Sequence, residues 1–205
     1  MNFLAHLHLA YLTGTSPVGN LLGDFVKGPV PDALPSSIAT GIRLHRSIDG
    51  FTDAHPEHRA AVRAFEAPWR RYGGILVDVL YDHLLSRHWA RFEVLPMRTF
   101  LDNHYQALFD YDAGRAGHAP ALPPVLIRMA EQDWLSSYAE VADVQRALDG
   151  IGRRLRQPVP LGDGVGSLDQ ARWMALEAGF LRFYPELMAF AVKAASTGER
   201  GESHG

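Results

Sequence analysis

The sequence contains no cysteine, and this absence excludes both a disulfide framework and a thiolate metal site. It also lacks an apolar run near the roughly 18 residues that a membrane-spanning helix needs, so no membrane role is expected. Basic residues are not in excess: 20 lysines and arginines stand against 23 acidic residues, and the net charge of -3 argues against a nucleic-acid binder. Any bound metal ion would therefore have nitrogen and oxygen ligands.

Apolar residues recur with helical spacing along nearly the whole chain, and no alternating pattern long enough to indicate a β-strand is present. Breaks rich in glycine and proline divide this pattern into about seven helices. A chain of 205 residues is long enough for one well-buried core. We therefore predict one all-α domain over residues 1–195, a multi-helix bundle, followed by a flexible, glycine-rich tail over residues 196–205.

The first twelve residues are apolar, but they have neither the charged start nor the small-residue cleavage site of a signal peptide. They also include two histidines, which a signal sequence does not need. We interpret this segment as the first helix of the fold and expect a cytoplasmic protein.

The most informative pattern is a set of histidines and carboxylates placed among apolar residues. Asp82 and His83 stand side by side on a predicted helix that is otherwise apolar, and Asp78 lies one turn earlier on the same face. An acid and an imidazole in such a helix are costly unless they are paired, hydrogen-bonded or bound to an ion. Two interpretations of Asp82 and His83 therefore stay open: a metal-binding or catalytic role, and a buried pair with a structural role only.

Three further segments show the same mixture. His45 and Asp49 are four residues apart, so both would lie on one helical face, as metal ligands or as an ordinary surface pair. Asp24 is a single acid in an apolar run. His6 and His8 are two apart, about 200° around a helix, so only one can reach an ion. We favour His6, because His8 falls on the side that would fill the core.

Several other chemistries are excluded because their motifs are missing. The sequence has no His-Glu-x-x-His zinc helix and no Gly-x-Ser-x-Gly nucleophile turn. The glycines between residues 14 and 19 have the spacing of a phosphate loop but are not followed by its lysine. No Glu-x-x-His pair of a di-iron bundle is found.

Four stretches also carry a family resemblance. They read NFLAHLHLA over residues 2–10, GNLLGDFVKG over 19–28, HRSID over 45–49 and DHLLSRHW over 82–89. Together they resemble the bacterial acyl carrier protein phosphodiesterase family. The resemblance implies an all-α fold, distantly similar to the HD-domain phosphohydrolases. It also implies hydrolysis of the phosphodiester that joins 4′-phosphopantetheine to a serine of holo-acyl carrier protein, assisted by Mn²⁺ or Mg²⁺.

The resemblance and the residue pattern select the same candidate ligands. The metal ligands we predict are His6, Asp24, His45, Asp49, Asp82 and His83. Donor nitrogens and oxygens suit Mn²⁺ or Mg²⁺, and Fe²⁺ as a further option, better than structural zinc. His83, Asp82 and His45 are also the catalytic candidates, with His83 or His45 protonating the departing serine oxygen. In the HD signature a histidine precedes an aspartate, whereas in this sequence His83 follows Asp82.

An enzyme acting on the acidic carrier protein should present basic residues around its cleft, because opposite charge speeds and orients the encounter. Arg43, Arg46 and Arg87 flank the predicted ligands and are the expected partner-binding residues. A separate basic cluster lies at residues 153–156. Two alternatives stay open: an HD-like phosphohydrolase of a nucleotide or another small phosphoester, and a non-catalytic helical protein that binds metal.

Overall fold

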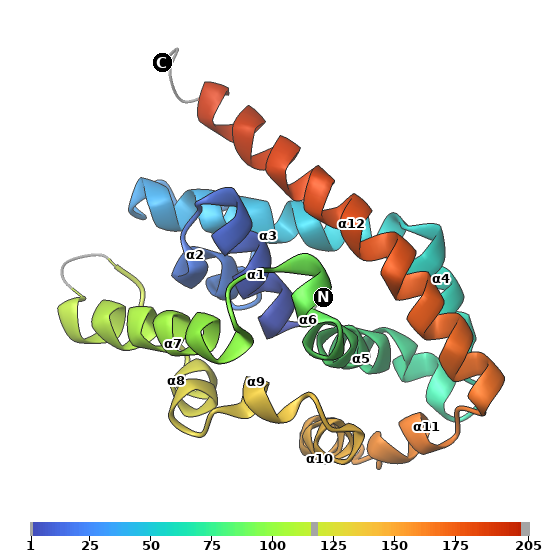
Figure 1. The fold of residues 1–205 in the computed structure, drawn as a ribbon. Coiled ribbons are helices and arrows are strands. Elements are labelled where there is room, and N and C mark those ends of the chain that lie inside the picture. Colours follow the sequence, from blue (N-terminus) through green and yellow to red (C-terminus); the bar gives the residue numbers. More distant parts are fainter. Residues whose placement is uncertain (1, 116–118, 202–205) are drawn as a thin grey trace.

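The computed structural model describes residues 2–115 and 119–201. These residues form twelve α-helices and one short 3-10 helix, and they contain no β-strand (Figure 1). The predicted all-α class is thereby confirmed. In chain order the elements are α1 (Phe3–Thr13), α2 (Pro17–Leu22), α3 (Ser36–Ala54), α4 (Pro56–Arg63), the 3-10 helix η1 (Trp69–Tyr72), α5 (Gly73–Arg87), α6 (Trp89–Phe92), α7 (Met97–Gly114), α8 (Pro124–Glu131), α9 (Trp134–Ser137), α10 (Val141–Gly152), α11 (Gly162–Gly166) and α12 (Gln170–Gly201).

The helices outnumber the seven or so that apolar spacing indicates. The difference comes from very short elements: α6 and α9 have four residues each and α11 has five. A single turn contains too few residues to show a helical period, so only the surrounding packing defines it.

Helix α1 lies at the centre of the fold and packs against α2, α5 and α12 (Figure 1). Every residue from Leu4 to Ala10 is buried, including both histidines. A helix that is buried on all sides belongs to the interior, and any polar group on it needs a partner there. The position of α1 therefore explains why His6 and His8 cannot be surface residues.

Two glycines bring α2 directly against α3. A Cβ atom on Gly19 would lie 2.6 Å from the carbonyl oxygen of Ile38, and one on Gly41 would lie 2.8 Å from the backbone nitrogen of Asn20. The two helices thus approach backbone to backbone. Ser16 fixes the start of α2, because its side chain accepts a hydrogen bond of 3.0 Å from the Gly19 N–H.

The longest helix, α12, has 32 residues and lies across α3 and α4, with further contacts to α1 and α5 (Figure 1). Residues 196–201, which we predicted as part of a flexible tail, continue this helix. Residues 202–205 lie outside the described part of the chain. Of the helices in the described part, none combines the length and the apolar character needed to cross a bilayer.

Candidate metal centre

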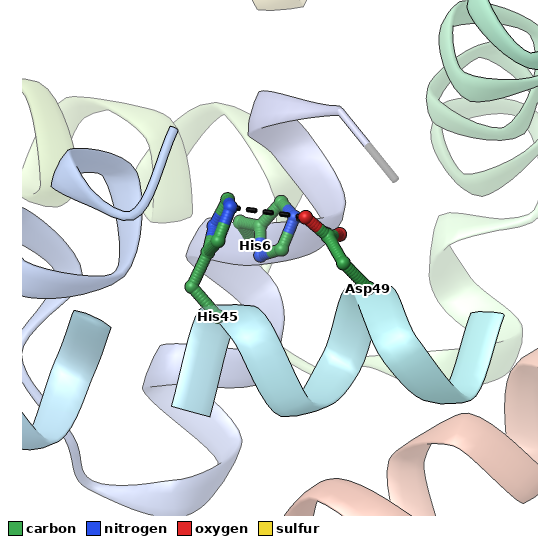
Figure 2. A group of neighbouring side chains, drawn as sticks. All are labelled: His6, His45 and Asp49. Carbon is green, nitrogen blue, oxygen red and sulfur yellow. Dashed lines mark ion pairs between the residues drawn. The ribbon is translucent and has the colours of Figure 1, made fainter. Parts of the chain in front are cut away.

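Three of the predicted ligands meet where α1 faces α3. His6 comes from α1, and His45 and Asp49 come from consecutive turns of α3 (Figure 2). His6 Nε2 lies 3.2 Å from Asp49 Oδ1, and His45 Nε2 lies 3.1 Å from Asp49 Oδ2. One ligand atom from each residue lies within 4.8 Å of the other two. We call His6, His45 and Asp49 the His-His-Asp group.

Asp24, in the segment after α2, joins this group from the solvent side. Its Oδ1 lies 3.5 Å from His45 Nε2. The side chains of Asp24 and Asp49 are 48% and 37% exposed, whereas both histidine rings are buried. The arrangement therefore has two buried imidazole rings at its base and two partly exposed carboxylates at its open side.

Asn20 sets the protonation of His6. The Asn20 side-chain oxygen lies 2.8 Å from His6 Nδ1, so in this orientation Nδ1 carries the proton and donates it. Burial lowers the pKa of His6, and it outweighs the nearby Asp49 carboxylate, which raises it. A neutral His6 then turns the lone pair of Nε2 toward the Asp49 oxygen. Two acceptors at 3.2 Å require a proton or a cation between them.

His45 shows the opposite behaviour. Burial lowers its pKa, but hydrogen bonds and charge attraction from Asp24 and Asp49 outweigh that effect and raise the pKa to about 9. Burial would raise the pKa of Asp49, but its hydrogen bond with the charged His45 ring outweighs burial and holds that pKa well below its usual range. The site thus combines two ionised carboxylates with one positive charge on His45, and it attracts cations.

Asp82 occupies a different place, at the start of α1. Its two carboxylate oxygens accept hydrogen bonds from the N–H groups of Leu4, at 2.8 Å, and Ala5, at 3.1 Å. Asn2, at the N-cap position of α1, supplies no such side-chain bond. Asp82 therefore caps α1 from another helix, one to two residues before His6. Complete burial raises its pKa to about 7, despite the two backbone hydrogen bonds that lower it.

His83 also lies apart from the His-His-Asp group. Its Nδ1 lies 2.7 Å from the carbonyl oxygen of Tyr138, to which it donates, and its ring meets that of Trp173 edge to face. Its Nε2 is buried without a hydrogen-bond partner. The structure thus does not bring Asp82 or His83 to the group, and the metal and catalytic roles predicted for them stay predictions.

The remaining histidines of the sequence pattern have other partners. His8 Nδ1 lies 2.8 Å from the Tyr184 hydroxyl, so of the two α1 histidines only His6 reaches the group. His88 Nε2 lies 2.6 Å from a Glu177 oxygen, in keeping with the ordinary helix-end environment expected there.

The three predicted partner-binding arginines are dispersed. Arg46 donates to the Val26 carbonyl oxygen at 2.6 Å, within the segment that follows Asp24. Arg43 lines a hollow between α3 and the end of α12, and Arg87 is exposed at the end of α5. Of the three, Arg46 is the one tied to the segment that carries Asp24.

Sequence reasoning missed two residues that shape the site. Asn20 orients His6, and Gly23 leaves room for the His45 ring. Both lie in the stretch GNLLGDFVKG, in which Asp24 was the one residue predicted to have a role. The four-residue step from Asn20 to Asp24 is the signal that could have identified the asparagine.

Comparison with known proteins matches the sequence of this chain to one family. The family model described as acyl carrier protein phosphodiesterase matches residues 1–187. A protein of that name from Enterobacter sp. (strain 638) is 39% identical over 196 residues, covering 93% of this chain and 97% of the relative. The proteins of that name from Escherichia coli O157:H7 (strain EC4115 / EHEC) and from strain K12 / DH10B are each 38% identical over 200 residues, covering 95% of this chain and 100% of the relative. No solved structure matches significantly, so the predicted HD-like character stays a prediction. The match along nearly the full length shows that the chain belongs to the acyl carrier protein phosphodiesterase family.

Proposed function

We propose that this protein hydrolyses the phosphodiester bond between 4′-phosphopantetheine and the serine of holo-acyl carrier protein, leaving apo-carrier, and that it uses a divalent metal ion. Family membership supports the reaction, since the relatives are named for it. The single observation in the structure that carries the proposal is the convergence of His6, His45 and Asp49 beside a second carboxylate, Asp24.

The donor set fits a divalent cation. His6 Nε2 and Asp49 Oδ1 face each other as two acceptors, and a cation between them would relieve the repulsion. Asp24 and Asp49 supply two negative charges, which balance a doubly charged ion once that ion has displaced the Nε2 proton of His45. Imidazole ligands suit Fe²⁺ and carboxylate ligands suit Mn²⁺, whereas Mg²⁺ prefers oxygen ligands and water, so for this mixed set we propose Mn²⁺ as the first ion to test.

The roles of the residues follow from their positions. A divalent ion held by His6, His45 and Asp49 would neutralise phosphate charge and lower the pKa of a bound water. Asn20 keeps the His6 proton on Nδ1, which leaves the lone pair of Nε2 available to bind the ion. Asp24 keeps the His45 ring in place from the open side. The open, exposed side of Asp24 and Asp49 is where a phosphodiester would enter.

Asp82 and His83 act as positioning residues in this proposal. Asp82 fixes the first turn of α1 and so helps to fix the position of His6 on that helix. His83 holds the Tyr138 backbone next to α5. Neither contact needs the side chain to touch the substrate.

The proposed partner is the acidic holo-acyl carrier protein, met in the cytoplasm. Arg43, Arg46 and Arg87 remain the proposed docking residues. Arg43 and Arg87 are exposed and Arg46 is half-buried. Charges at such positions act over distances near the Debye length, about 10 Å at 0.1 M salt, so carrier turnover should fall as salt rises.

Incubation of the purified protein with holo-carrier and Mn²⁺, followed by mass spectrometry of the carrier, tests the proposal. We expect the carrier to lose the mass of the phosphopantetheine group, and excess chelator to prevent that loss. An unchanged carrier mass with active hydrolysis of a small phosphodiester would instead support a small-molecule phosphohydrolase. Full carrier turnover in chelator would exclude a loosely held ion.

A further inference from the structure

A cleft of about 710 Å³ lies between the start of α1, the segment after α2, and helices α8 to α10. Four exposed arginines line it, Arg128, Arg146, Arg153 and Arg154, and Arg146 is ion-paired with Asp143, which lines the cleft too. Of the apolar residues in the lining, Phe3 and Ile151 are half-buried and Tyr138 is buried. The lining thus combines apolar side chains with an excess of positive charge, and neither metal binding nor the capping of α1 accounts for it.

This cleft begins next to the His-His-Asp group. Asn2 lines the cleft, and its carbonyl oxygen accepts a hydrogen bond of 3.2 Å from the His6 N–H one turn later. Phe25, at another edge of the cleft, directly follows Asp24, whose carboxylate contacts His45. A molecule whose phosphate reached the His-His-Asp group could therefore extend its remaining atoms into the cleft.

Asp82 and His83, which the sequence predicted as metal ligands, each stabilise a part of the cleft lining. Asp82 caps the turn of α1 that contributes Asn2 and Phe3, and His83 binds the backbone of Tyr138. Side chains on adjacent positions of α5 therefore secure two neighbouring parts of the lining, since the Tyr138 side chain is itself hydrogen-bonded to Asn2. Such rigid support is what a binding site for a flexible chain requires, because ordering the ligand is already costly.

We infer that this cleft binds the pantetheine arm of the substrate, an uncharged aliphatic chain with amide groups that extends from the phosphate. The inference rests on the proposed function and specifies where the substrate lies. Ligand sites of this kind are mostly apolar with a few polar groups that fix orientation, and their volumes fall in the range of about 300–1,000 Å³. Asn2 and Ser137 supply polar groups for the amides, while Phe3, Trp134 and Ile151 contact the aliphatic parts.

Gly150 on α10 provides a direct test. It lines the cleft, and a Cβ atom there would meet only Arg153 Nη2, at 3.7 Å. Gly150→Phe should therefore fold, since glycine is also a poor helix former, and its ring would project into the cleft and block part of it. The matched control is Gly74→Phe in the first turn of α5, where a Cβ atom meets nothing within 4 Å and which does not line the cleft.

Two measurements decide the inference. The first is calorimetric binding of free 4′-phosphopantetheine in the presence of Mn²⁺, and the second is kcat/KM for holo-carrier. We expect Gly150→Phe to weaken both at least about tenfold, equivalent to about 1.4 kcal/mol, while Gly74→Phe matches the wild type and Mn²⁺ affinity is the same in all three proteins.

The outcomes separate this inference from the proposed function. Wild-type binding or carrier turnover that survives Gly150→Phe unchanged would overturn the cleft assignment, as would a wild type that does not bind phosphopantetheine at all. A wild type that binds phosphopantetheine in a Gly150-dependent manner but never releases it from holo-carrier would overturn the proposed reaction and leave the cleft as a site for this arm.

Discussion

Gly23 lies directly against the ring of His45. A Cβ atom on Gly23 would stand 2.2 Å from Cγ and 2.3 Å from Cδ2 of that imidazole. Both distances are too short for non-bonded carbon atoms. The ring is buried, and its Nε2 contacts Asp24 and Asp49. The absence of a side chain at residue 23 is therefore a condition for the position of His45.

The first prediction follows for Gly23→Ala. The added methyl group should displace the His45 ring and lower Mn²⁺ affinity by about 10–100-fold, the cost that is usual when a supporting contact of a metal ligand is lost. Calorimetric titration with Mn²⁺ measures this, and circular dichroism checks that the helices are intact. Gly74→Ala is the control, because its Cβ atom meets nothing within 4 Å. Unchanged Mn²⁺ affinity in Gly23→Ala would show that His45 does not bind the ion.

The second prediction concerns Asp49, which contacts both histidines. Asp49→Asn keeps the size of the side chain but removes its charge, so Mn²⁺ affinity should fall by more than the roughly 10–100-fold expected for a supporting residue. Phosphopantetheine release should fall with it. Asp53→Asn, one turn later on α3 and exposed, is the matched control and should behave like the wild type. Equal Mn²⁺ affinities in the two variants would remove Asp49 from the ligand set.

Local sequence spacing predicted the part of the site that one helix builds. His45 and Asp49 are one turn apart on α3, and in the structure His45 Nε2 lies 3.1 Å from Asp49 Oδ2. The choice of His6 over His8 also followed from helix geometry, since the two point to different sides of α1. The helical class was predictable for the same reason, because its signal is the apolar period itself.

Contacts between distant segments could not be predicted in this way. Asp82 and Leu4 are 78 residues apart, and nothing in either segment shows that the carboxylate caps α1. A buried acid on an apolar helix looks the same in the sequence whether it binds a metal ion or a helix N-terminus, since both satisfy its charge. The extension of α12 to Gly201 was also missed, because its last residues are polar and rich in glycine.

The third prediction tests the close contact of α2 with α3. Gly41→Ala should lower the free energy of unfolding by about 1–3 kcal/mol, because its Cβ atom would lie 2.8 Å from backbone atoms of Gly19 and Asn20 and would force the helices apart. Urea denaturation measures the change. Gly50→Ala lies on the same helix with no atom within 4 Å, and it should be neutral or stabilising by up to about 1 kcal/mol. Equal stabilities of the two variants would contradict the packing described.

The last prediction is a pH dependence of stability that arises from Asp82. Its pKa is raised from 3.8 to about 7 in the folded protein, chiefly by burial, so the folded state binds a proton more strongly than the unfolded state does. A proton bound preferentially by the folded state stabilises it at low pH. The contribution of Asp82 should therefore be greatest below pH 4, decline between about pH 4 and pH 7, and stay constant above that range.

Asp82→Asn carries no titrating group at this position, so the stability difference between wild type and variant should change with pH over that window and only there. At about 1.4 kcal/mol per pKa unit, the change is of the order of 1–4 kcal/mol. Urea denaturation of metal-free protein at a series of pH values from 4 to 8 measures it. The control Asp53→Asn should run parallel to the wild type, since that side chain is exposed. A pH-independent difference for Asp82→Asn would mean that the carboxylate stays ionised at the start of α1, held by the Leu4 and Ala5 N–H groups strongly enough to offset its burial.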